Sequence, residues 1–207
     1  MRSDRRKELV MKVLVIGATG NIGRVAASAL EEQGHEVVRA SRSSDPSVDL
    51  ADTASIAALF ASLDALDAVV VAAGEVPFKP VTELTREDYA DAFAVKTLGQ
   101  LDVVRHAFEH LRDGGSVTLT SGVLSREPIA TASAAAAANG AIESFVTTAA
   151  TEAPRGIRLN VVSPDVLENS PHHHATFPGH RPVSDAEVAR AFVRAVDGVG
   201  TGRTISV

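Results

Sequence analysis

Short apolar runs recur along the chain and alternate with longer stretches in which apolar and polar residues repeat with a helical period. The runs are rich in valine, isoleucine and leucine and have the length of β-strands. They predict strands at residues 13–17, 35–41, 67–74, 116–121, 157–163 and 203–207. Near-continuous apolar strands are typical of parallel sheets covered on both faces.

The stretches between these runs predict helices that would cover such a sheet. The helices run up to about residue 33 and over residues 53–63, 84–111, 132–152 and 184–196. We expect Gly114 and Gly115 to end the long helix, and Ser184 with Glu187 to form a capping box at the start of the last one. Strands that alternate with helices predict a single α/β domain with a doubly wound parallel sheet, a Rossmann fold.

Composition and charge narrow the possible partners. The chain has 207 residues, 45% of them hydrophobic and 22% charged, with no cysteine and a net charge of −6. The negative charge argues against a nucleic acid or an anionic membrane surface as partner. The apolar run at residues 68–73 is far shorter than the roughly 20 residues of a membrane span. Without cysteine, a reducing compartment is the natural expectation, so we predict a cytoplasmic protein.

Residues 1–10 are rich in charge and precede the first strand. They lack the apolar core and cleavage site of a secretory signal, so we expect a flexible extension there. The folded domain is expected to cover residues 11–207, with a small substrate loop at about residues 165–183.

A glycine-rich turn links the first strand to the first helix. The sequence "VLVIGATGNIGRVAASAL" places Gly17, Gly20 and Gly23 at this junction. Glycine there permits a tight turn, a close approach of the backbone to a pyrophosphate and close packing of helix on strand. The helix N-terminus adds free N–H groups and a positive dipole end. A strand before it and a helix after it make this a specific dinucleotide-binding signal, although a tight turn without a ligand is the alternative.

The end of the second strand indicates which dinucleotide is preferred. The chain there reads Ser41-Arg42-Ser43, without the carboxylate that would bind the ribose of NAD. The guanidinium of Arg42 could pair with a 2′-phosphate, which favours NADP(H), or it could simply be solvated. Asp49 could meet the adenine amino group or serve as a loop or helix-cap residue.

Taken together, these motifs resemble those of the short-chain dehydrogenase/reductase family. The resemblance covers residues 12–207 and depends on "GATGNIG", "DLAD", "AAG", "TLTSG", "RLNVVSP" and the ending "GRTISV". It implies a sheet of about seven parallel strands with a nicotinamide cofactor along its carboxyl edge.

The resemblance also implies roles for individual residues. Gly17, Gly20 and Gly23 would hold the pyrophosphate, and Thr19, Asn21 and Ile22 would supply further loop contacts. Along the adenosine ribose would lie Ala72, Ala73 and Gly74, although the family's usual asparagine in this motif is Ala72 here. Ser121 stands at the catalytic serine position and would bind the substrate carbonyl oxygen. Pro164 matches the family's proline after this strand, Asp165 replaces the usual glycine, and Leu167 would lie near the nicotinamide carboxamide.

The chain departs from the family on the helix after the serine strand. The family places a Tyr-x-x-x-Lys pair there, whose tyrosine exchanges the proton and whose lysine binds the nicotinamide ribose. Here these positions hold Ala135 and Asn139, of which Asn139 is kept as a candidate cofactor-binding residue, and a further family asparagine falls on Lys96. Tyr89, the only tyrosine, lies on another helix, where we expect it in packing or an interface. Reduction of a ketone leaves an alkoxide that needs a proton, so the proton must come from elsewhere or the chain does not perform this reaction.

Two replacements for the missing groups can be named. Lys96 could reach the ribose from the neighbouring helix, or it could be a structural lysine. One of His172, His173, His174 and His180 in the substrate loop could deliver a proton, or the loop could be an ordinary exposed one. We do not expect a metal, because the sequence places no further ligands beside these histidines.

The sequence therefore supports an NADP(H)-dependent oxidoreductase that acts on a small carbonyl or alcohol substrate by a divergent mechanism. In this hypothesis Ser121 and Lys96 are the candidate catalytic residues. The alternative is a non-catalytic NADP(H)-binding sensor or assembly protein, and a non-redox isomerase or lyase is a third hypothesis. Because the alanine-rich helix lines the dimer interface in the family, we also expect a homodimer or homotetramer.

Overall fold

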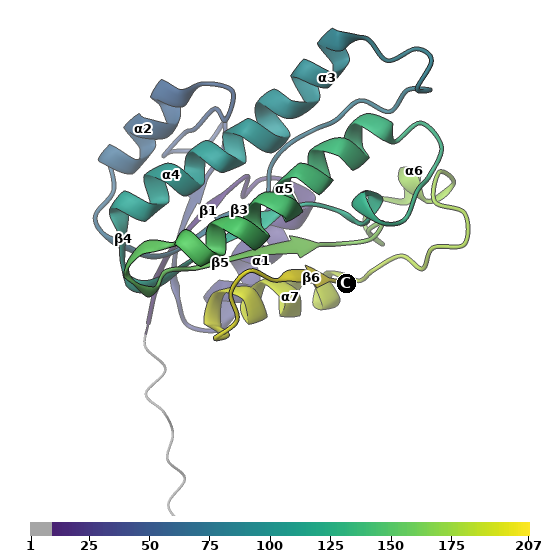
Figure 1. The fold of residues 1–207 in the computed structure, drawn as a ribbon. Helices are drawn as coiled ribbons and strands as arrows, with labels where there is room; N and C mark the ends of the chain where they lie inside the picture. Colours follow the sequence, from purple (N-terminus) through teal and green to yellow (C-terminus); the bar gives the residue numbers. More distant parts are fainter. Residues whose placement is uncertain (1–9) are drawn as a thin grey trace, which may run out of the picture.

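A computed structural model describes residues 10–207 and shows six parallel strands in the order β2-β1-β3-β4-β5-β6 (Figure 1). Nearly all of the expected extension at residues 1–10 lies outside the described residues. The strands are β1 Lys12–Ile16, β2 Glu36–Ala40, β3 Leu66–Val71, β4 Leu111–Thr120, β5 Arg158–Ser163 and β6 Thr204–Ser206. The predicted α/β class with a doubly wound parallel sheet is confirmed.

Seven α-helices connect these strands within the described range. They are α1 Asn21–Glu32, α2 Thr53–Ala61, α3 Arg86–Ala92, α4 Gln100–His110, α5 Ser133–Glu152, α6 Pro171–His174 and α7 Asp185–Asp197. A π-helical segment, η1 Phe93–Gly99, joins α3 to α4, and two short 3₁₀ turns, η2 Val123–Ser125 and η3 Pro154–Gly156, flank α5. The expected capping box begins α7, where the Ser184 hydroxyl accepts from the Glu187 amide and the Glu187 carboxylate accepts from the Ser184 amide. None of these helices is long and apolar enough to cross a bilayer.

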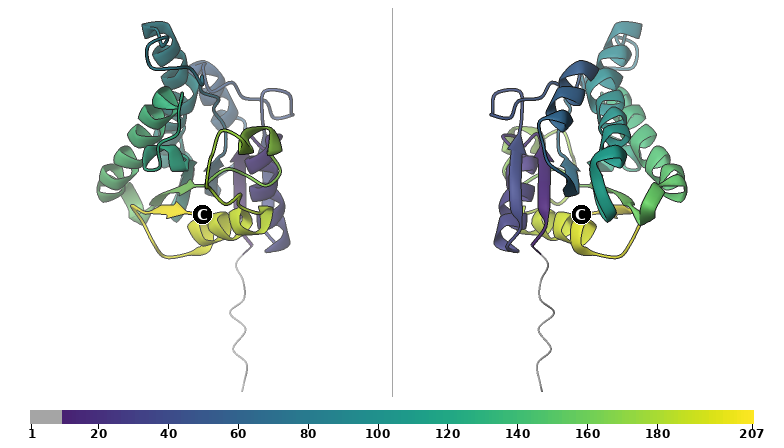
Figure 2. Two further views of the ribbon diagram at one scale, coloured as in Figure 1. Left: turned by 90° about the vertical axis from the view of Figure 1, so that its right-hand side faces the viewer. Right: turned by 90° about the vertical axis from the view of Figure 1, so that its left-hand side faces the viewer.

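The helices form one layer on each face of the sheet, as the two side views show (Figure 2). Helices α1 and α7 pack together on one face, and α2, α4 and α5 cover the other. Two apolar cores result. One lies between the sheet and α1 with α7 and includes Val15, Leu30 and Phe192, and the other lies under α2, α4 and α5 and includes Phe60 and Ile142. Because both faces are buried, the strands carry continuous apolar runs rather than alternating ones.

The expected count of about seven strands is wrong, since the described chain forms six. After β2 the chain goes through a turn and α2 directly into β3, which pairs with β1. No strand therefore extends the sheet beyond β2 in the described part of the chain. The seventh strand was implied by the family resemblance, and residues 41–65 contain no additional apolar run to form it.

The predicted helix at residues 84–111 also differs from the structure. It starts at Arg86, changes to π-helical hydrogen bonding at Phe93–Gly99 and ends at His110. The glycine pair does not end it, because β4 already begins at Leu111, which pairs with Leu66 in β3. Gly114 and Gly115 instead lie where the β3–β4 register shifts. The short helix α6 was not expected.

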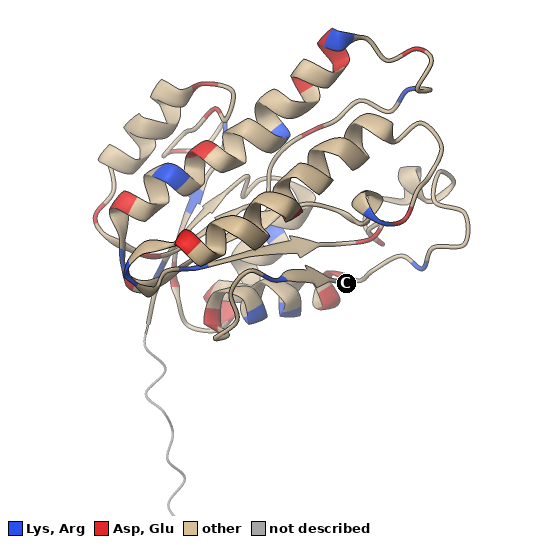
Figure 3. Cartoon of the chain, viewed as in Figure 1, with Lys and Arg blue, Asp and Glu red and all other residues tan. Residues whose placement is uncertain are grey.

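Acidic and basic residues are interspersed along the described part of the chain (Figure 3). On α7, for example, acidic residues lie at both ends and Arg190 and Arg194 lie between them. Large basic patches are what a phosphate backbone requires of its partner. Such an arrangement accords with the expectation that the chain binds no nucleic acid, which stays a prediction.

Candidate active site

A cavity of about 650 Å³ lies at the carboxyl ends of the central strands. From β1 the chain first runs outward to β2 and then returns to β3 on the other side, so the strand order reverses between β1 and β3. Open α/β sheets bind ligands at this kind of switch point. The cavity is lined by segments from β1 to α6 that lie far apart in the sequence.

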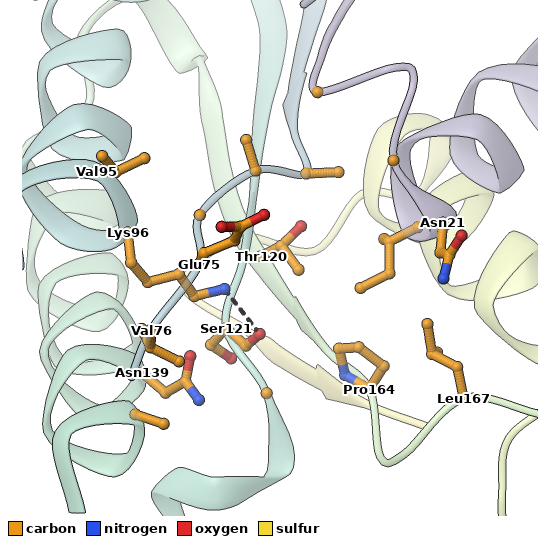
Figure 4. Close-up of a pocket in the computed structure, with 18 of the residues that line it drawn as sticks. Asn21, Glu75, Val76, Val95, Lys96, Thr120, Ser121, Asn139, Pro164 and Leu167 are labelled. Atoms are coloured by element: carbon orange, nitrogen blue, oxygen red, sulfur yellow. Dashed lines mark hydrogen bonds between the residues drawn. The ribbon is translucent and has the colours of Figure 1, made fainter. Parts of the chain in front are cut away.

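Nearly all of the predicted site residues line this cavity. They are Gly17, Thr19, Gly20, Asn21, Ile22, Ser41, Arg42, Asp49, Ala72, Ala73, Gly74, Lys96, Ser121, Asn139, Pro164 and Leu167. Figure 4 shows side chains around one space that come from α1 (Asn21), η1 (Lys96), the end of β4 (Ser121), α5 (Asn139) and the segment after β5 (Pro164 and Leu167). The location is a structural finding, whereas the role of each residue remains a prediction.

Gly23 is the one predicted cofactor residue that does not line the cavity. A Cβ atom at Gly23 would lie 2.1 Å from the carbonyl oxygen of Gly17, so this position serves the close packing of α1 against the turn. Gly17 has φ of +82°, and a Cβ there would lie 2.4 Å from the carbonyl oxygen of Ala72. These two glycines build the loop, and Gly20 is left exposed at the N-cap of α1.

The turn after β2 brings Arg42 and Asp49 to the outer end of the cavity. Arg42 is exposed and has no hydrogen-bond or ion-pair partner among residues 10–207, which leaves its guanidinium free for a ligand. The Ser41 hydroxyl is used within the turn, where it bonds Ser44 and the Ser43 amide. The Asp49 carboxylate accepts from the Ala51 amide, while Asp52 caps α2. Asp49 therefore makes a local loop contact, and its contact with the adenine amino group stays a prediction.

Lys96 is a buried cation on the cavity wall. Its side chain is packed against Gly74, where a Cβ would come within 2.6 Å of the lysine Cδ. The residue is only 8% exposed, and its Nζ donates to the carbonyl oxygen of Ser121 at 3.3 Å (Figure 4). Burial lowers the pKa of Lys96 from 10.5 to about 8. An ammonium group has three N–H donors, so two remain for a ligand or water.

The π-helical segment holds Lys96 in this place. The buried Gln100 side chain donates to the carbonyl oxygens of Lys96 and Thr120, each at 2.9 Å, and accepts from the Thr120 amide. These hydrogen bonds join η1 and the start of α4 to the end of β4, directly beside the cavity. π-Helical turns within α-helices are frequent at functional sites, because the irregular hydrogen bonding re-aims side chains.

Helix α5 presents Ala135 and Asn139 to the cavity. Both residues are buried, and neither can replace a tyrosine as a proton donor of suitable acidity. The Oδ1 atom of Asn139 is buried without a hydrogen-bond partner within the described range. An unsatisfied buried amide oxygen is uncommon and indicates room for a donor from a ligand or water.

The hydroxyl of Ser121 has a partner that the sequence did not suggest. It donates to Glu143 at 2.7 Å, and Glu143 lies one helical turn after Asn139 on α5. Glu143 also accepts from the Ser125 hydroxyl at 2.9 Å and from Arg126 at 2.6 Å. Arg126 in turn donates to hydroxyls on β5 and β6. This network joins the serine strand, α5 and the sheet edge, and it holds Ser121 in one orientation.

We expect Glu143→Ala to destabilise the protein by about 1–3 kcal/mol, because two hydroxyls and a guanidinium would lose their shared acceptor. Burial raises the pKa of Glu143, but the hydrogen bonds from Arg126, Ser121 and Ser125 outweigh it, so the pKa is lowered overall. The stabilisation is therefore present above the pKa of the unfolded-state carboxyl and disappears as the pH falls through the lowered value. Urea unfolding of the wild type and variant at neutral and acidic pH measures this. If Glu143→Ala destabilised the protein equally at neutral and at acidic pH, the expected pH dependence would be contradicted.

The expected substrate loop covers the other side of the cavity. The Asn21 side chain donates to the Ser170 hydroxyl at 3.1 Å and ties this loop to the glycine turn. His173 lines the cavity, whereas His174 bonds the Leu167 carbonyl and His180 pairs with Asp165 at 2.8 Å. Burial, together with its two histidine neighbours, lowers the pKa of His173. Among the described residues, no three side chains are placed to hold a metal ion.

Several residues near the cavity were missed by the sequence analysis. Glu75, Val76, Phe78 and Phe177 line it, and Glu143 supports it from behind. For Glu143 a signal existed, because it follows Asn139 by four residues and so lies on the same helix face. Tyr89 lines a separate hollow with Arg86, Ala90 and Phe93, which agrees with its expected absence from the site.

Solved structures share this architecture. A protein from Listeria innocua, lin1944, is 42% identical and superposes with a TM-score of 0.93 over 96% of this chain and 100% of that one. A small-chain dehydrogenase solved in complex with NADPH is 29% identical, with a TM-score of 0.85 over 96% of each chain. Both likenesses span nearly the whole chain.

Curated relatives match over a shorter stretch. A hydroxynaphthalene reductase-like protein of Metarhizium brunneum is 38% identical over 101 residues, which are 48% of this chain and 38% of that protein. An uncharacterised oxidoreductase of Methylorubrum extorquens is 35% identical over 115 residues, or 55% of this chain and 46% of its own length. The chain thus spans less than half the length of these curated relatives.

A family model described as enoyl-(acyl carrier protein) reductase, which represents short-chain dehydrogenases and reductases, matches residues 17–197. The match begins at the glycine turn and ends with α7, so it includes the elements around the cavity other than β1. The chain belongs to the short-chain dehydrogenase/reductase family.

Proposed function

We propose that the chain is an NADP(H)-dependent oxidoreductase that acts on a small carbonyl or alcohol substrate and uses Lys96 in place of the missing tyrosine. The observation that carries the proposal is the buried ammonium of Lys96, which has one acceptor within residues 10–207 and lines the same cavity as the predicted nucleotide-binding residues. Burial of a charge is unfavourable, so an unpaired buried lysine in a cleft is a candidate functional group.

The cavity fits a dinucleotide on structural grounds. The turn at Gly17 and Gly20 leaves the backbone of the α1 N-terminus open to phosphates, and Arg42, after β2, has no ion-pair or hydrogen-bond partner among the described residues. At the other end, the unpartnered Oδ1 of Asn139 can accept from a sugar hydroxyl. The relative that was solved with NADPH supports the choice of NADP(H).

When bound, the reduced nicotinamide supplies the hydride. The residues of this chain supply orientation and a proton. Lys96 donates to the Ser121 carbonyl, which fixes its position, and its remaining N–H groups can bind a sugar hydroxyl or the substrate oxygen. With a pKa of about 8, the ammonium is mostly protonated at neutral pH and can still release a proton. Positioned proton donors contribute about 10² to 10⁴ in rate.

The alternative function is a non-catalytic NADP(H)-binding sensor or assembly protein. Two observations favour it, namely Ala135 at the tyrosine position and the engagement of the Ser121 hydroxyl with Glu143. A homodimer or homotetramer and a cytoplasmic location remain predictions in either case.

The two functions differ in turnover. The first predicts that bound NADPH is oxidised when a substrate is added, which stopped-flow absorbance would record across a set of aldehydes, ketones and quinones. Tight NADPH binding without oxidation by any of them would establish the alternative. Absence of binding to both nicotinamide nucleotides, in calorimetry, would refute both.

We expect Arg42→Ala to weaken NADPH binding by about 10- to 100-fold and NADH binding by much less, because a hydrogen-bonded charge pair contributes about 1.5–3 kcal/mol. Fluorescence titration with both nucleotides measures the difference. Arg190→Ala is the matched control, since Arg190 is exposed on α7, outside the cavity lining, and its loss should change neither affinity. Equal losses for the two nucleotides in Arg42→Ala would contradict the NADP(H) preference.

A further inference from the structure

The part of the cavity next to Ser121 has apolar walls. Leu124, Ala135, Val166 and Phe177 belong to a small apolar cluster separate from the two main cores, with Val76 packed against it. All five residues line the cavity. An apolar wall with few polar groups favours an uncharged ligand, because each charge moved there from water would lose its hydration.

Aromatic rings stand at the same part of the cavity. Phe78, from the segment after β3, stacks on His173 of α6 with ring centroids 6.2 Å apart and an interplanar angle of 29°. Both residues line the cavity, and the Phe78 side chain remains partly exposed there. Rings in this arrangement offer a flat face to a flat ligand, and such contacts add stabilisation beyond the buried area.

The cavity carries carboxylates in addition to the Lys96 ammonium. Glu75 lines the same cavity as Lys96 and Ser121 (Figure 4). Asp165 also lines the cavity and is paired with His180. The Lys96 ammonium attracts an anion and the Glu75 carboxylate repels one, so the charges of the cavity give an anionic substrate no clear advantage over a neutral ring.

The proton requirement narrows the substrate class. Hydride addition to a saturated ketone produces an alkoxide about as basic as hydroxide, whose parent water has a pKa of about 15.7. A conjugated ring spreads the charge instead, as in a phenolate, whose parent has a pKa of about 10. Proton transfer is efficient when donor and acceptor are matched, and Lys96, with its pKa lowered to about 8, is matched to a phenolate. The cavity offers the Lys96 ammonium as a proton donor, whereas Ala135, at the family's tyrosine position, has only a methyl group. The site therefore suits the less basic of the two products, the phenolate.

Resting on the function proposed above, we propose that the substrate is a small uncharged quinone, seated between the apolar wall of Leu124 and Phe177 and the ring of Phe78. The quinone gains a hydride and becomes a hydroquinone monoanion, while the reduced nicotinamide is oxidised. The Lys96 ammonium gives its proton to the anionic oxygen and is protonated again by water. One quinone, one NADPH and one proton thus give one hydroquinone and one NADP⁺.

The first test compares ring-matched substrates on the full-length protein. NADPH affinity is measured by fluorescence titration, and NADPH oxidation is then followed with benzoquinone, naphthoquinone, cyclohexanedione and a naphthoquinone sulfonate, with the enzyme-free rate subtracted. We expect kcat/KM for the neutral quinones to exceed those of the saturated diketone and the sulfonate by at least about 100-fold. NADPH binding with equal or faster turnover of the saturated diketone would overturn the quinone assignment and leave the oxidoreductase proposal intact. NADPH binding without turnover of any substrate would overturn both the quinone assignment and the oxidoreductase proposal. Absence of NADPH binding in the initial titration would also overturn both.

The second test needs no turnover. The affinity for naphthoquinone is measured by calorimetry on the NADP⁺-loaded protein, which cannot reduce it. Phe78→Ala should weaken this affinity about tenfold, the size of one aromatic contact, while NADPH affinity stays within about twofold. Val81→Ala is the matched control, because Val81 is an exposed residue of the same segment that does not line the cavity. If Phe78→Ala left the naphthoquinone affinity unchanged, or if Val81→Ala lowered it equally, the proposed binding position of the quinone would be overturned.

Discussion

A Lys96→Met variant is expected to be more stable than the wild-type protein and about 10² to 10⁴ less active. The stability gain follows from burial, which lowers the pKa of Lys96 from 10.5 to about 8. Each pKa unit corresponds to 1.36 kcal/mol, so keeping the ammonium charged in the folded state costs up to about 3 kcal/mol, which methionine removes. A residue that lowers stability while it supports activity is typical of a functional site.

The stability gain of Lys96→Met should decrease as the pH rises. Between about pH 8 and pH 10.5 the unfolded chain binds a proton at Lys96 that the folded chain has released, so wild-type stability rises with pH over this range. The advantage of Lys96→Met is therefore largest below about pH 8 and shrinks above it. In the wild type, kcat/KM for reduction should fall as the pH rises through about 8, because the proton donor is lost.

Urea unfolding from pH 7 to 10 and steady-state kinetics over the same range measure both effects. Lys12→Met is the matched control, since Lys12 forms ion pairs with Glu36 and Asp64 and does not line the cavity. It should neither stabilise the protein nor slow the reaction. Full activity in Lys96→Met would show that this lysine is structural, and a loss of stability would show that its charge is compensated in the fold.

The second large effect is expected for Gly20→Ala, which should fold normally and lose nucleotide affinity by about 100-fold or more. Gly20 is exposed, its φ of −77° suits alanine, and its Cβ would lie at 3.4 Å from the Gly17 carbonyl oxygen. The added methyl group would instead occupy the space through which a pyrophosphate approaches the backbone. Melting curves and NADPH titration together separate folding from binding.

Two other glycines provide comparisons. Gly23→Ala should impair folding as well as binding, because its Cβ would lie 2.1 Å from the Gly17 carbonyl oxygen. Gly140→Ala should raise stability by about 0.5–1 kcal/mol and leave binding unchanged, since the position is inside α5 with no atom within 4 Å of the added Cβ. Wild-type affinity in Gly20→Ala would mean that no dinucleotide phosphate rests on this turn.

The glycine turn and the elements around it could be predicted because their signals are local. Gly17, Gly20 and Gly23 follow a strand and open a helix within a few residues, and the structure places them there. The six strands at the predicted runs have the same physical basis, since a fully buried strand needs a continuous apolar segment. The expected seventh strand came from the family resemblance and had no such segment to support it.

The side-chain contacts of Ser121 could not be predicted from local sequence signals. Its position beside the cavity followed from its place at the end of a strand, but its hydroxyl bonds Glu143, which is 22 residues away in the chain. Lys96 and Ser121 are 25 residues apart, and their contact requires the packing of η1 against the end of β4. The spacing from Asn139 places Glu143 on the same face of α5, but the spacing between the two partners of each contact does not reveal that they meet.

The sequence by itself determined the parallel α/β sheet, the glycine turn and the absence of a Tyr-x-x-x-Lys pair, because these depend on residue type and on short-range order along the chain. The tertiary structure decided the number of strands, the partner of Ser121, the burial of Lys96 and the apolar wall with Phe78. Hydrogen bonds, desolvation and pKa values depend on which distant segments meet, and that is settled only when helices and strands pack.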